Sequence, residues 1–443
     1  MRSSTIYTAV LLLVAALHPA SLWSQEVPRE ALEAVTVEPA AVLVDGPEAV
    51  RGLLVHGQRK DRRVVDLTHV AEYRSSTTDL FTVDPRGVVT AIADGAGAVE
   101  VVIAGRTISV PVQIQGTRIP RHDHFENDII PILSKHSCNA SGCHGKAEGK
   151  NGFKLSVFGF NPTADYDAIT KEGRGRRAFP GAAERRLILT KASGGVPHGG
   201  GIRFYPDSRE YNTLREWIAS GVPVGDPAAP IIHRIEILPA ERIMDTGAGQ
   251  QLRVLAFYSD GREVDVTQIA KYQSNNDGLA SVDEEGQVQI GKVPGQVAVM
   301  ATYMGAVDTF QALIPRKQRI QPEHYPELAE KNFIDRLVHV RLKNLHIIPS
   351  AASDDAEFLR RAFLSIIGTL PTADEVRQFL DDSSAEKRAR LVDDLLERPE
   401  YADFWALKWS DLLRVDRKKL GHRGAHEYYA WIHRSVDENK TLD

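Results

Sequence analysis

The feature that most constrains the fold of this chain is an internal repeat, in which two distant segments match at a single separation of 199 residues. The tripeptides that begin at Asp66 and Asp265 both read aspartate, an aliphatic residue and threonine. Three further pairs keep this separation: Tyr73-Arg74-Ser75 with Tyr272-Gln273-Ser274, Val83-Asp84 with Val282-Asp283, and Gly87-Val88-Val89 with Gly286-Gln287-Val288. One separation shared by four motifs predicts two copies of one domain.

Each copy has the sequence pattern of a β-sandwich. Short apolar and polar alternations, such as residues 252–257, are separated by turn dipeptides such as Asp260-Gly261. Strands of this length and spacing are typical of two packed sheets. We expect the recurring aspartates and serines to cap turns and strand ends, which is their usual role at such positions, and not to form a catalytic set.

The repeated motifs resemble the bacterial immunoglobulin-like group 2 domain, which has an invasin- and intimin-like fold. The resemblance rests on the Asp-x-Thr tripeptide, the serine after the aromatic residue and the Val-Asp-x-x-Gly-x-Val turn. It covers residues 33–115 and 231–315. The resemblance implies two immunoglobulin-like sandwiches that act as structural spacers or adhesive modules.

The segment between the two copies holds the only two cysteines of the chain, Cys138 and Cys143, and His144 directly follows the second. In c-type haem attachment, two thiols add across the porphyrin vinyl groups and the adjacent imidazole binds the iron. The usual motif has two residues between the cysteines, whereas this chain has four. A disulfide between Cys138 and Cys143 is the alternative that the pattern leaves open.

Two predicted helices frame this motif. The first has an apolar stripe at four-residue spacing, which Pro131 is expected to kink or shorten: Phe125, Ile129 and Leu133. The second begins after Asp207 or Ser208, ends at Gly221 and has its own stripe: Tyr211, Leu214 and Ile218. A helix on each side of an attachment motif is the frame of a small cytochrome c.

The segment resembles the planctomycete-type cytochrome c domain over residues 118–228. The matching motifs include His144-Gly145-Lys146-Ala147, Lys150-Asn151-Gly152-Phe153-Lys154-Leu155-Ser156, Gly173-Arg174-Gly175-Arg176-Arg177 and Val196-Pro197-His198-Gly199-Gly200-Gly201. That family commonly has the wider cysteine spacing. The resemblance implies one covalent haem c per chain, with thioether bonds to Cys138 and Cys143 and with His144 as the proximal iron ligand.

We do not expect the sixth iron ligand to be methionine, the common choice in electron-transfer cytochromes, because no methionine falls between residues 118 and 228. His198 is the best candidate, since it lies in a glycine-rich loop whose backbone can approach a flat ring closely. His122, His124 and His136 are alternatives, although His136 is close to Cys138 in sequence. Bis-histidine ligation predicts a lower potential than histidine with methionine, and an empty sixth position would admit small ligands such as peroxide or nitric oxide.

Several arginines of this segment could neutralise the haem propionates through bidentate contacts: Arg174, Arg176, Arg177 and Arg203. A solvated basic loop is the alternative for each of them. No Ser-His-Asp, paired-carboxylate or phosphate-loop arrangement is found, which argues against a conventional hydrolase. Whether the chain catalyses a reaction stays open, and an electron carrier is the favoured interpretation.

The C-terminal region, residues 325–443, has helical periodicity. Helix starts are expected at Phe333, at Ser353 with Glu357, and at residues 370–376, with a further helix over residues 387–397. The region resembles an uncharacterised helical domain that commonly follows planctomycete-type cytochrome and immunoglobulin-like modules, and by that resemblance we expect the chain to be truncated. Three tryptophans are expected in its core: Trp405, Trp409 and Trp431. Three histidines lie close together in this region, but no carboxylate or cysteine of zinc-type spacing accompanies them, so we assign no metal to them: His422, His426 and His433.

The N-terminus predicts export. Arg2 precedes an apolar run over residues 6–17, and small residues between Ala20 and Ser24 suit signal-peptide cleavage, so residues 1–25 are predicted to be a signal peptide. An uncleaved anchor is the alternative. The apolar run is too short to span a bilayer, and no later stretch is long enough. The mature chain is therefore expected in the periplasm or at the cell surface.

Together these patterns predict a multidomain chain, in which two all-β immunoglobulin-like sandwiches flank a small, mainly helical cytochrome c-like domain and an α-helical domain follows. A formal net charge of −5 gives no reason to expect nucleic-acid binding. The favoured function is an exported electron-transfer or redox module that meets a redox partner protein or an envelope component. The alternative is a cell-surface adhesion or envelope protein without haem, in which Cys138 and Cys143 form a disulfide.

Overall fold

The computed structural model describes residues 32–47, 49–119, 123–318, 320–321, 324–326 and 329–441. The chain divides into two compact units between Ile348 and Pro349, and each is described by itself. The predicted signal peptide and His122 lie outside the described residues. Within the described ranges, none of the helices has both the length and the apolar character needed to cross a membrane.

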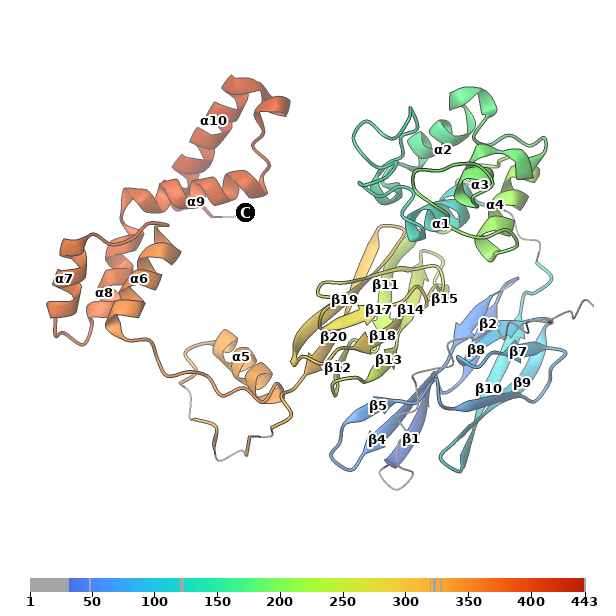
Figure 1. Cartoon of the computed structure of the whole chain (residues 1–443), viewed down its shortest axis with the longest axis horizontal. Coiled ribbons are helices and arrows are strands. Elements are labelled where there is room, and N and C mark those ends of the chain that lie inside the picture. Colours follow the sequence, from blue (N-terminus) through green and yellow to red (C-terminus); the bar gives the residue numbers. More distant parts are fainter. Residues whose placement is uncertain are drawn as a thin grey trace, which may run out of the picture. The chain divides into compact units, whose positions relative to one another are not determined.

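The first sandwich contains ten strands, β1 to β10 (Figure 1). Its sheets have the strand orders β1-β4-β5, β2-β10-β9-β6 and β3-β8-β7. Phe81, Val99 and Val101 are fully buried between the sheets. The strand bounds are β1 Leu32–Glu38, β2 Val42–Asp45, β3 Val50–Gly52, β4 Leu54–Arg59, β5 Val64–Asp66, β6 Glu72–Ser75, β7 Phe81–Val83, β8 Val88–Ala91, β9 Gly95–Ile103 and β10 Arg106–Gln115.

The second sandwich repeats this topology strand for strand, with the orders β11-β14-β15, β12-β20-β19-β16 and β13-β18-β17. In both copies one strand pair is parallel, β2 with β10 and β12 with β20. The two predicted β-sandwiches are therefore confirmed. The strand bounds are β11 Ile232–Leu238, β12 Glu241–Ile243, β13 Gly249–Gln251, β14 Arg253–Tyr258, β15 Glu263–Asp265, β16 Lys271–Ser274, β17 Ala280–Val282, β18 Gln287–Ile290, β19 Gly295–Tyr303 and β20 Ala306–Ile314.

The repeated aspartates cap turns, as predicted. Asp66 Oδ1 accepts hydrogen bonds from the amide and hydroxyl of Thr68, at 2.9 and 2.5 Å. Asp265 Oδ1 accepts the same pair from Thr267, at 3.0 and 2.6 Å. Each threonine hydroxyl in turn accepts from an amide of an earlier strand, Val55 in the first copy and Val254 in the second, which ties the motif to the sheet.

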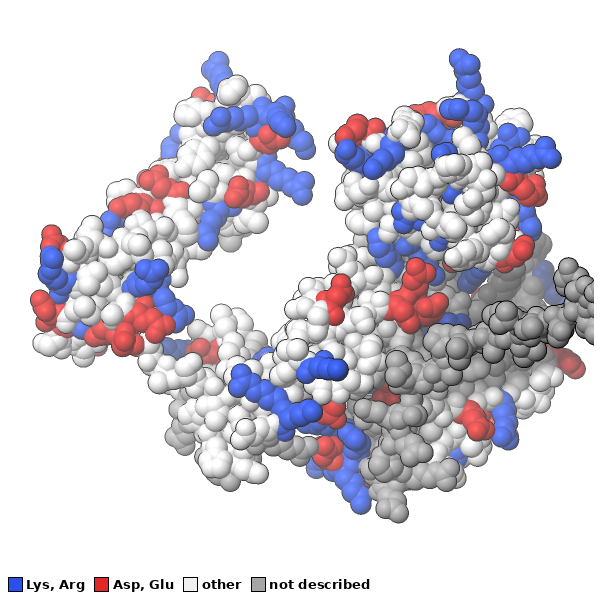
Figure 2. All heavy atoms as spheres, viewed as in Figure 1, with Lys and Arg blue, Asp and Glu red and all other residues white. Residues whose placement is uncertain are grey.

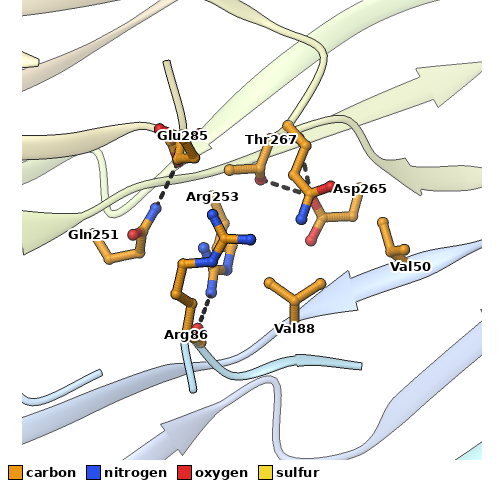
Figure 3. A pocket seen from close by; sticks show the side chains of 9 residues that line it. Val50, Arg86, Val88, Gln251, Arg253, Asp265, Thr267 and Glu285 are labelled. Carbon is orange, nitrogen blue, oxygen red and sulfur yellow. Dashed lines mark hydrogen bonds between the residues drawn. The ribbon is translucent and has the colours of Figure 1, made fainter. Parts of the chain in front are cut away.

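The two sandwiches are joined reciprocally through these same aspartates. Asp66 Oδ2 accepts from the amide of Gln251 at 2.5 Å, and Asp265 Oδ2 accepts from the amide of Gly52 at 2.7 Å. Gly52 and Gln251 are also 199 residues apart, so the contact has approximate two-fold symmetry. The Arg253 guanidinium lies in the same interface and donates to the carbonyl of Arg86 at 2.8 Å (Figure 3). The sandwiches therefore form a joined pair and are not independent spacers.

The segment between the sandwiches is helical. It begins with a π-helical turn, Phe125–Ile129, and contains α1 Ile130–Lys135, α2 Pro162–Thr170, α3 Leu187–Ala192 and α4 Arg209–Ala219. Three short 3₁₀ turns complete it: Val157–Gly159, Glu172–Gly175 and Ala183–Arg185. Both predicted helices are present, and the residues of the first stripe are buried: Phe125, Ile129 and Leu133.

Pro131 lies in the first turn of α1, where the regular helix that follows tolerates a proline. The wider π turn comes directly before it, so the proline marks the start of the regular α-helix. In α4 the hydroxyl of Ser208 caps the helix by accepting from the Tyr211 amide, and Trp217 is fully buried. That these helices belong to a cytochrome c stays a prediction.

Helix α5 Phe333–Asn344 belongs to the first unit, and Asn332 and Asp335 form a capping box at its start. The second unit consists of α6 Asp355–Ile366, α7 Ala373–Asp381, α8 Lys387–Leu396, α9 Pro399–Leu412 and α10 Arg417–Asp437. The expected helical character of the C-terminal region is therefore confirmed.

Two details of the second unit differ from the sequence predictions. The N-cap of α6 is Asp354 and not Ser353, because the Asp354 carboxylate accepts from the Glu357 amide. Trp431 is 50% exposed, so its placement in the core was wrong. Trp405 and Trp409 are partly buried, and the indole of Trp405 donates to the carbonyl of Ile366 at 3.0 Å.

Candidate functional site

A cavity of about 590 Å³ lies in the helical segment of the first unit. Its volume falls in the range of about 300–1,000 Å³ that is usual for ligand and cofactor sites. All four predicted site residues line it: Cys138, Cys143, His144 and His198. Apolar side chains complete much of the wall: Leu133, Phe153, Leu155, Ile188, Phe204 and Leu214.

The loop that carries the cysteines is a compact turn directly after α1. The amide of Cys138 donates to the carbonyl of Leu133, and the amide of His144 donates back to the carbonyl of Cys138 at 3.0 Å. A Cβ on Gly145 would overlap the backbone of Asn139, so glycine is required for this closure. The loop therefore brings both thiols and the imidazole to one cavity although four residues separate the cysteines.

The two cysteines are free, and no disulfide joins them. The disulfide of the alternative prediction is therefore not found. Burial raises the pKa of the Cys138 thiol to about 11, against a weaker opposing effect of Arg203. Cys138 is consequently held as a neutral thiol at neutral pH.

His144 and His198 face each other with matched orientations. Their ring centres are 6.4 Å apart and their planes differ by 8°. His144 Nδ1 lies 3.0 Å from the carbonyl oxygen of Phe153, and His198 Nδ1 lies 2.9 Å from that of Gly201. A carbonyl only accepts, so each Nδ1 donates a proton and each Nε2 keeps a lone pair. This hydrogen bond from the second ring nitrogen is the usual support of a metal-binding histidine.

The two rings are stacked, and the distance between their centres is close to that of two imidazoles that share one metal ion. An imidazole–metal bond is about 2 Å long and a ring nitrogen lies about 1 Å from its ring centre, so two imidazoles on opposite sides of one metal have centres about 6 Å apart. The observed 6.4 Å agrees with that value. Burial is the main cause that lowers the pKa of His144, which favours the neutral imidazole that metal binding requires.

The other candidate ligands have different partners. His124 caps the first helical turn by accepting from the Asn127 amide, and its Nε2 lies 3.2 Å from the carbonyl oxygen of Asp226. His136 Nε2 lies 3.6 Å from a Glu210 carboxylate oxygen. The nearby imidazole of His136 is the main cause that lowers the pKa of Glu210 to about 2, and Lys135 contributes. Neither ring lines the cavity, which His144 and His198 both do.

The four candidate arginines differ in their surroundings. Arg177 donates to the carbonyls of Ala168 and Gly152 and stacks on the ring of Phe153 at 4.4 Å, so it holds the cavity wall together. Arg176 lines the cavity and is exposed, whereas Arg174 is not among the lining residues.

Arg203 also lines the cavity, and its Nε is buried without a hydrogen-bond partner in the described structure. A buried donor that lacks an acceptor is unfavourable unless a bound group satisfies it. A porphyrin carries two propionate carboxylates, which are acceptors of the kind that a guanidinium binds. The residues that line the cavity therefore include the groups that would hold a haem: two thiols, two imidazoles and a positive charge.

Sequence reasoning missed the supporting groups. The carbonyl oxygens of Phe153 and Gly201 orient the two histidines, but backbone acceptors leave no mark in residue identity. Lys271 of the second sandwich donates to the hydroxyl of Ser137, beside Cys138, at 2.9 Å. Those two residues are 134 positions apart, and no local pattern signals their contact.

Within the described residues, no group of three or more histidine, cysteine, aspartate or glutamate side chains could hold an ion. In the second unit, His433 Nε2 lies 3.0 Å from a carboxylate oxygen of Asp403.

Comparison with known families places the C-terminal region. Residues 333–443 match the family described as PSCyt2, protein of unknown function (DUF1549). The match begins at the first residue of α5 and includes α6 to α10. The C-terminal region is therefore similar to the DUF1549 family, and the expected resemblance to an uncharacterised helical domain is confirmed for this part of the chain.

Other comparisons concern shorter or weaker similarities. The chain is 29% identical over 82 residues to Ice-binding protein 1 of Shewanella frigidimarina (strain NCIMB 400), and the match spans 18% of this chain and 9% of that protein. The structure of domains 4–9 of the surface layer protein SbsC aligns with 64% of this chain and 31% of the SbsC chain, at 12% identity and a TM-score of 0.26. The Yersinia pseudotuberculosis adhesin InvE covers 65% and 61%, at 9% identity and a TM-score of 0.14.

Proposed function

We propose that this chain is an exported c-type haem protein that transfers electrons, with one haem c bound covalently through Cys138 and Cys143. The observation that carries the proposal is the pairing of His144 and His198. Their rings are nearly parallel, 6.4 Å apart, and each is oriented by a backbone carbonyl. When bound, the haem supplies an iron that alternates between the ferrous and ferric states.

The residues of the cavity favour electron transfer over ligand activation. His144 and His198 would both bind the haem iron, which would leave no free ligand position for a small molecule. Ligation by two histidines, in place of histidine and methionine, gives a lower potential. The apolar wall limits water around the ring, and Arg203 would bind a propionate. A redox partner protein or an envelope component would exchange the electron.

Export is supported by the leader pattern of residues 1–25 and by the chemistry of the site, since bacteria attach haem to c-type proteins outside the cytoplasm. We place the mature chain in the periplasm or at the cell surface for these reasons. An envelope protein without haem is the second candidate. The disulfide bond that this candidate assumed is not found, because Cys138 and Cys143 are free.

The test is co-expression of the full chain with a haem-attachment system, followed by haem staining of a denaturing gel and intact-mass measurement. Cys138→Ala and Cys143→Ala are each expected to reduce covalent haem, and the double variant to abolish it. Absence of haem mass from the matured wild-type chain would refute the proposal.

The same preparation tests the ligand pair. His198→Ala is expected to convert a low-spin absorption spectrum to a high-spin one and to let the ferrous form bind carbon monoxide. His233→Ala is the matched control, because His233 is exposed on the second sandwich, and it should leave the spectrum unchanged. A low-spin spectrum that persists in His198→Ala would exclude His198 and make His122 the next candidate.

A further inference from the structure

The charges around the cavity are of one sign. No aspartate or glutamate lines it. Five cationic side chains do: Lys150, Arg176, Arg177, Lys191 and Arg203. The chain as a whole carries a formal net charge of −5, so this concentration of positive charge runs against the overall composition. Figure 2 shows Lys and Arg side chains spread over the part of the first unit that contains α1 to α4.

Most of these cations have no acidic partner. Arg177 pairs with Glu172 at 3.0 Å. Lys191 Nζ donates to the carbonyl of Pro197, and Arg176 Nε donates to the carbonyl of Gly173. In the part of the chain that the structure describes, no carboxylate oxygen lies within 4 Å of a side-chain nitrogen of Lys150, Arg176 or Lys191. These three cations therefore form no ion pair within the described residues, although Glu148 is close enough to Lys150 that this charge, after the hydrogen bond from Lys146, contributes to lowering the pKa of Glu148.

The cations also differ in depth. Arg203 is half-buried, with its Nε sealed from solvent, and is suited to an anionic group inside the cavity. Lys150 and Arg176 are exposed and Lys191 is half-buried, so these three form a positively charged mouth open to solvent. Like charges at the rim of an apolar cleft concentrate the field and attract molecules of opposite charge.

We propose that the mouth formed by Lys150, Arg176 and Lys191 docks an acidic electron-transfer protein, which presents carboxylates to these side chains. This inference rests on the proposed haem function. One electron passes from the ferrous iron to the partner's acceptor centre, the iron becomes ferric, and no bond forms or breaks. Charge complementarity at such a rim raises the association rate, and salt screens it.

The experiment uses the full chain with haem attached and two inorganic one-electron oxidants as probes. Hexacyanoferrate(III) is an anion and tris(1,10-phenanthroline)cobalt(III) is a cation. Stopped-flow oxidation of the ferrous protein is expected to slow with rising ionic strength for the anion and to quicken for the cation. Equal salt dependence for both oxidants would overturn the proposal.

At low salt, the double variant Lys150→Gln/Lys191→Gln is expected to lower the oxidation rate with hexacyanoferrate(III) by about threefold to tenfold, which is within the range that electrostatic steering produces. The same variant should raise the oxidation rate with the cobalt complex. The control Lys292→Gln/Lys317→Gln removes the same charge from exposed positions outside the helical segment and should change neither rate. Equal effects of the two double variants would show that only net charge matters and would overturn the assignment to the mouth.

Haem staining of the same preparation separates the two possible failures. A preparation without haem refutes the proposed function itself. A preparation with haem, an unchanged absorption spectrum and no charge selectivity refutes only the acidic partner.

Discussion

The two sandwiches have the same strand order and the same capping bonds, yet they contact different neighbours. Lys271 of the second copy donates to Ser137 beside the cysteine loop and lies 5.3 Å from the ring centre of Phe158. The residue 199 positions earlier is Glu72, which is exposed and paired with Arg74 of its own strand. The shared motif therefore determines the fold, and a few surface residues determine which copy supports the site.

The interface between the copies shows a second difference. The reciprocal bonds of Asp66 and Asp265 are symmetric, but Arg253 has no counterpart, because the equivalent residue of the first copy is Leu54. Arg253 donates to the carbonyls of Leu53 and Arg86 and fills the space beside Gly52. The two sandwiches are thus related by approximate two-fold symmetry, and the contacts of Arg253 break that symmetry.

The largest expected effect concerns Asp265. Its carboxylate is 8% exposed and accepts three hydrogen bonds, one of them from the other sandwich. Asp265→Ala is expected to lower the free energy of unfolding by about 3 kcal/mol, because it leaves buried donors unsatisfied. Asp66→Ala should cost less, about 2 kcal/mol, because Asp66 is only half-buried.

Urea unfolding followed by hydrogen exchange and mass spectrometry can measure both sandwiches in one sample. Asp277→Ala is the control, since Asp277 is an exposed loop residue of the second copy. If Asp265→Ala destabilised only the second sandwich, the aspartate would act as a local cap and not as a bridge between the copies.

Gly52 gives the next largest effect. A Cβ at this position would overlap Arg253 Nε, whereas the equivalent residue of the second copy is Gln251. Gly52→Ala is expected to cost about 1–3 kcal/mol through overpacking. Adding Arg253→Ala should recover part of this loss, so that the double variant is less destabilised than the sum of the two single variants. Strict additivity, measured by the same unfolding experiment, would show that the two residues do not interact.

The sequence was sufficient to predict what local patterns encode. The Asp-x-Thr tripeptides, the strand alternation and the helix caps each act within a few residues, and they led to the correct sheets and helices. His198 was selected because residues 118–228 lack methionine and because its loop is rich in glycine, and the structure brings it opposite His144.

Contacts between distant residues could not be predicted. The bond from Lys271 to Ser137 and the bonds that join the copies depend on how folded surfaces meet, and neither motif nor periodicity records that. The error at Trp431 has the same origin, because helical spacing indicates an apolar face but not whether another element covers it.

A smaller effect is expected where the second copy meets the cysteine loop. Lys271→Met removes the bond to the Ser137 hydroxyl and should loosen that contact by about 1 kcal/mol, which is typical of one hydrogen bond. The matched change in the first copy, Glu72→Gln, should have no effect on the loop. Faster hydrogen exchange at residues 136–145 in the Lys271 variant alone would support the difference between the copies. Equal exchange in both variants would contradict it.

The smallest effect is a pH dependence confined to the first copy. His56 is 7% exposed, and the equivalent residue of the second copy is Leu255. Burial is the main cause that lowers the pKa of His56 below 6.5, and the nearby charge of Arg242 adds to it. Below pH 6.5 the unfolded chain therefore binds a proton more readily than the folded chain, so stability falls as the pH decreases through this range.

Hydrogen exchange corrected for intrinsic rates should show the first sandwich losing protection between pH 7 and pH 5 relative to the second. His56→Leu, which copies the residue of the second sandwich, should remove that difference, because no titrating group then remains at this position. A difference that survived the substitution would assign the pH dependence to another group of the first sandwich.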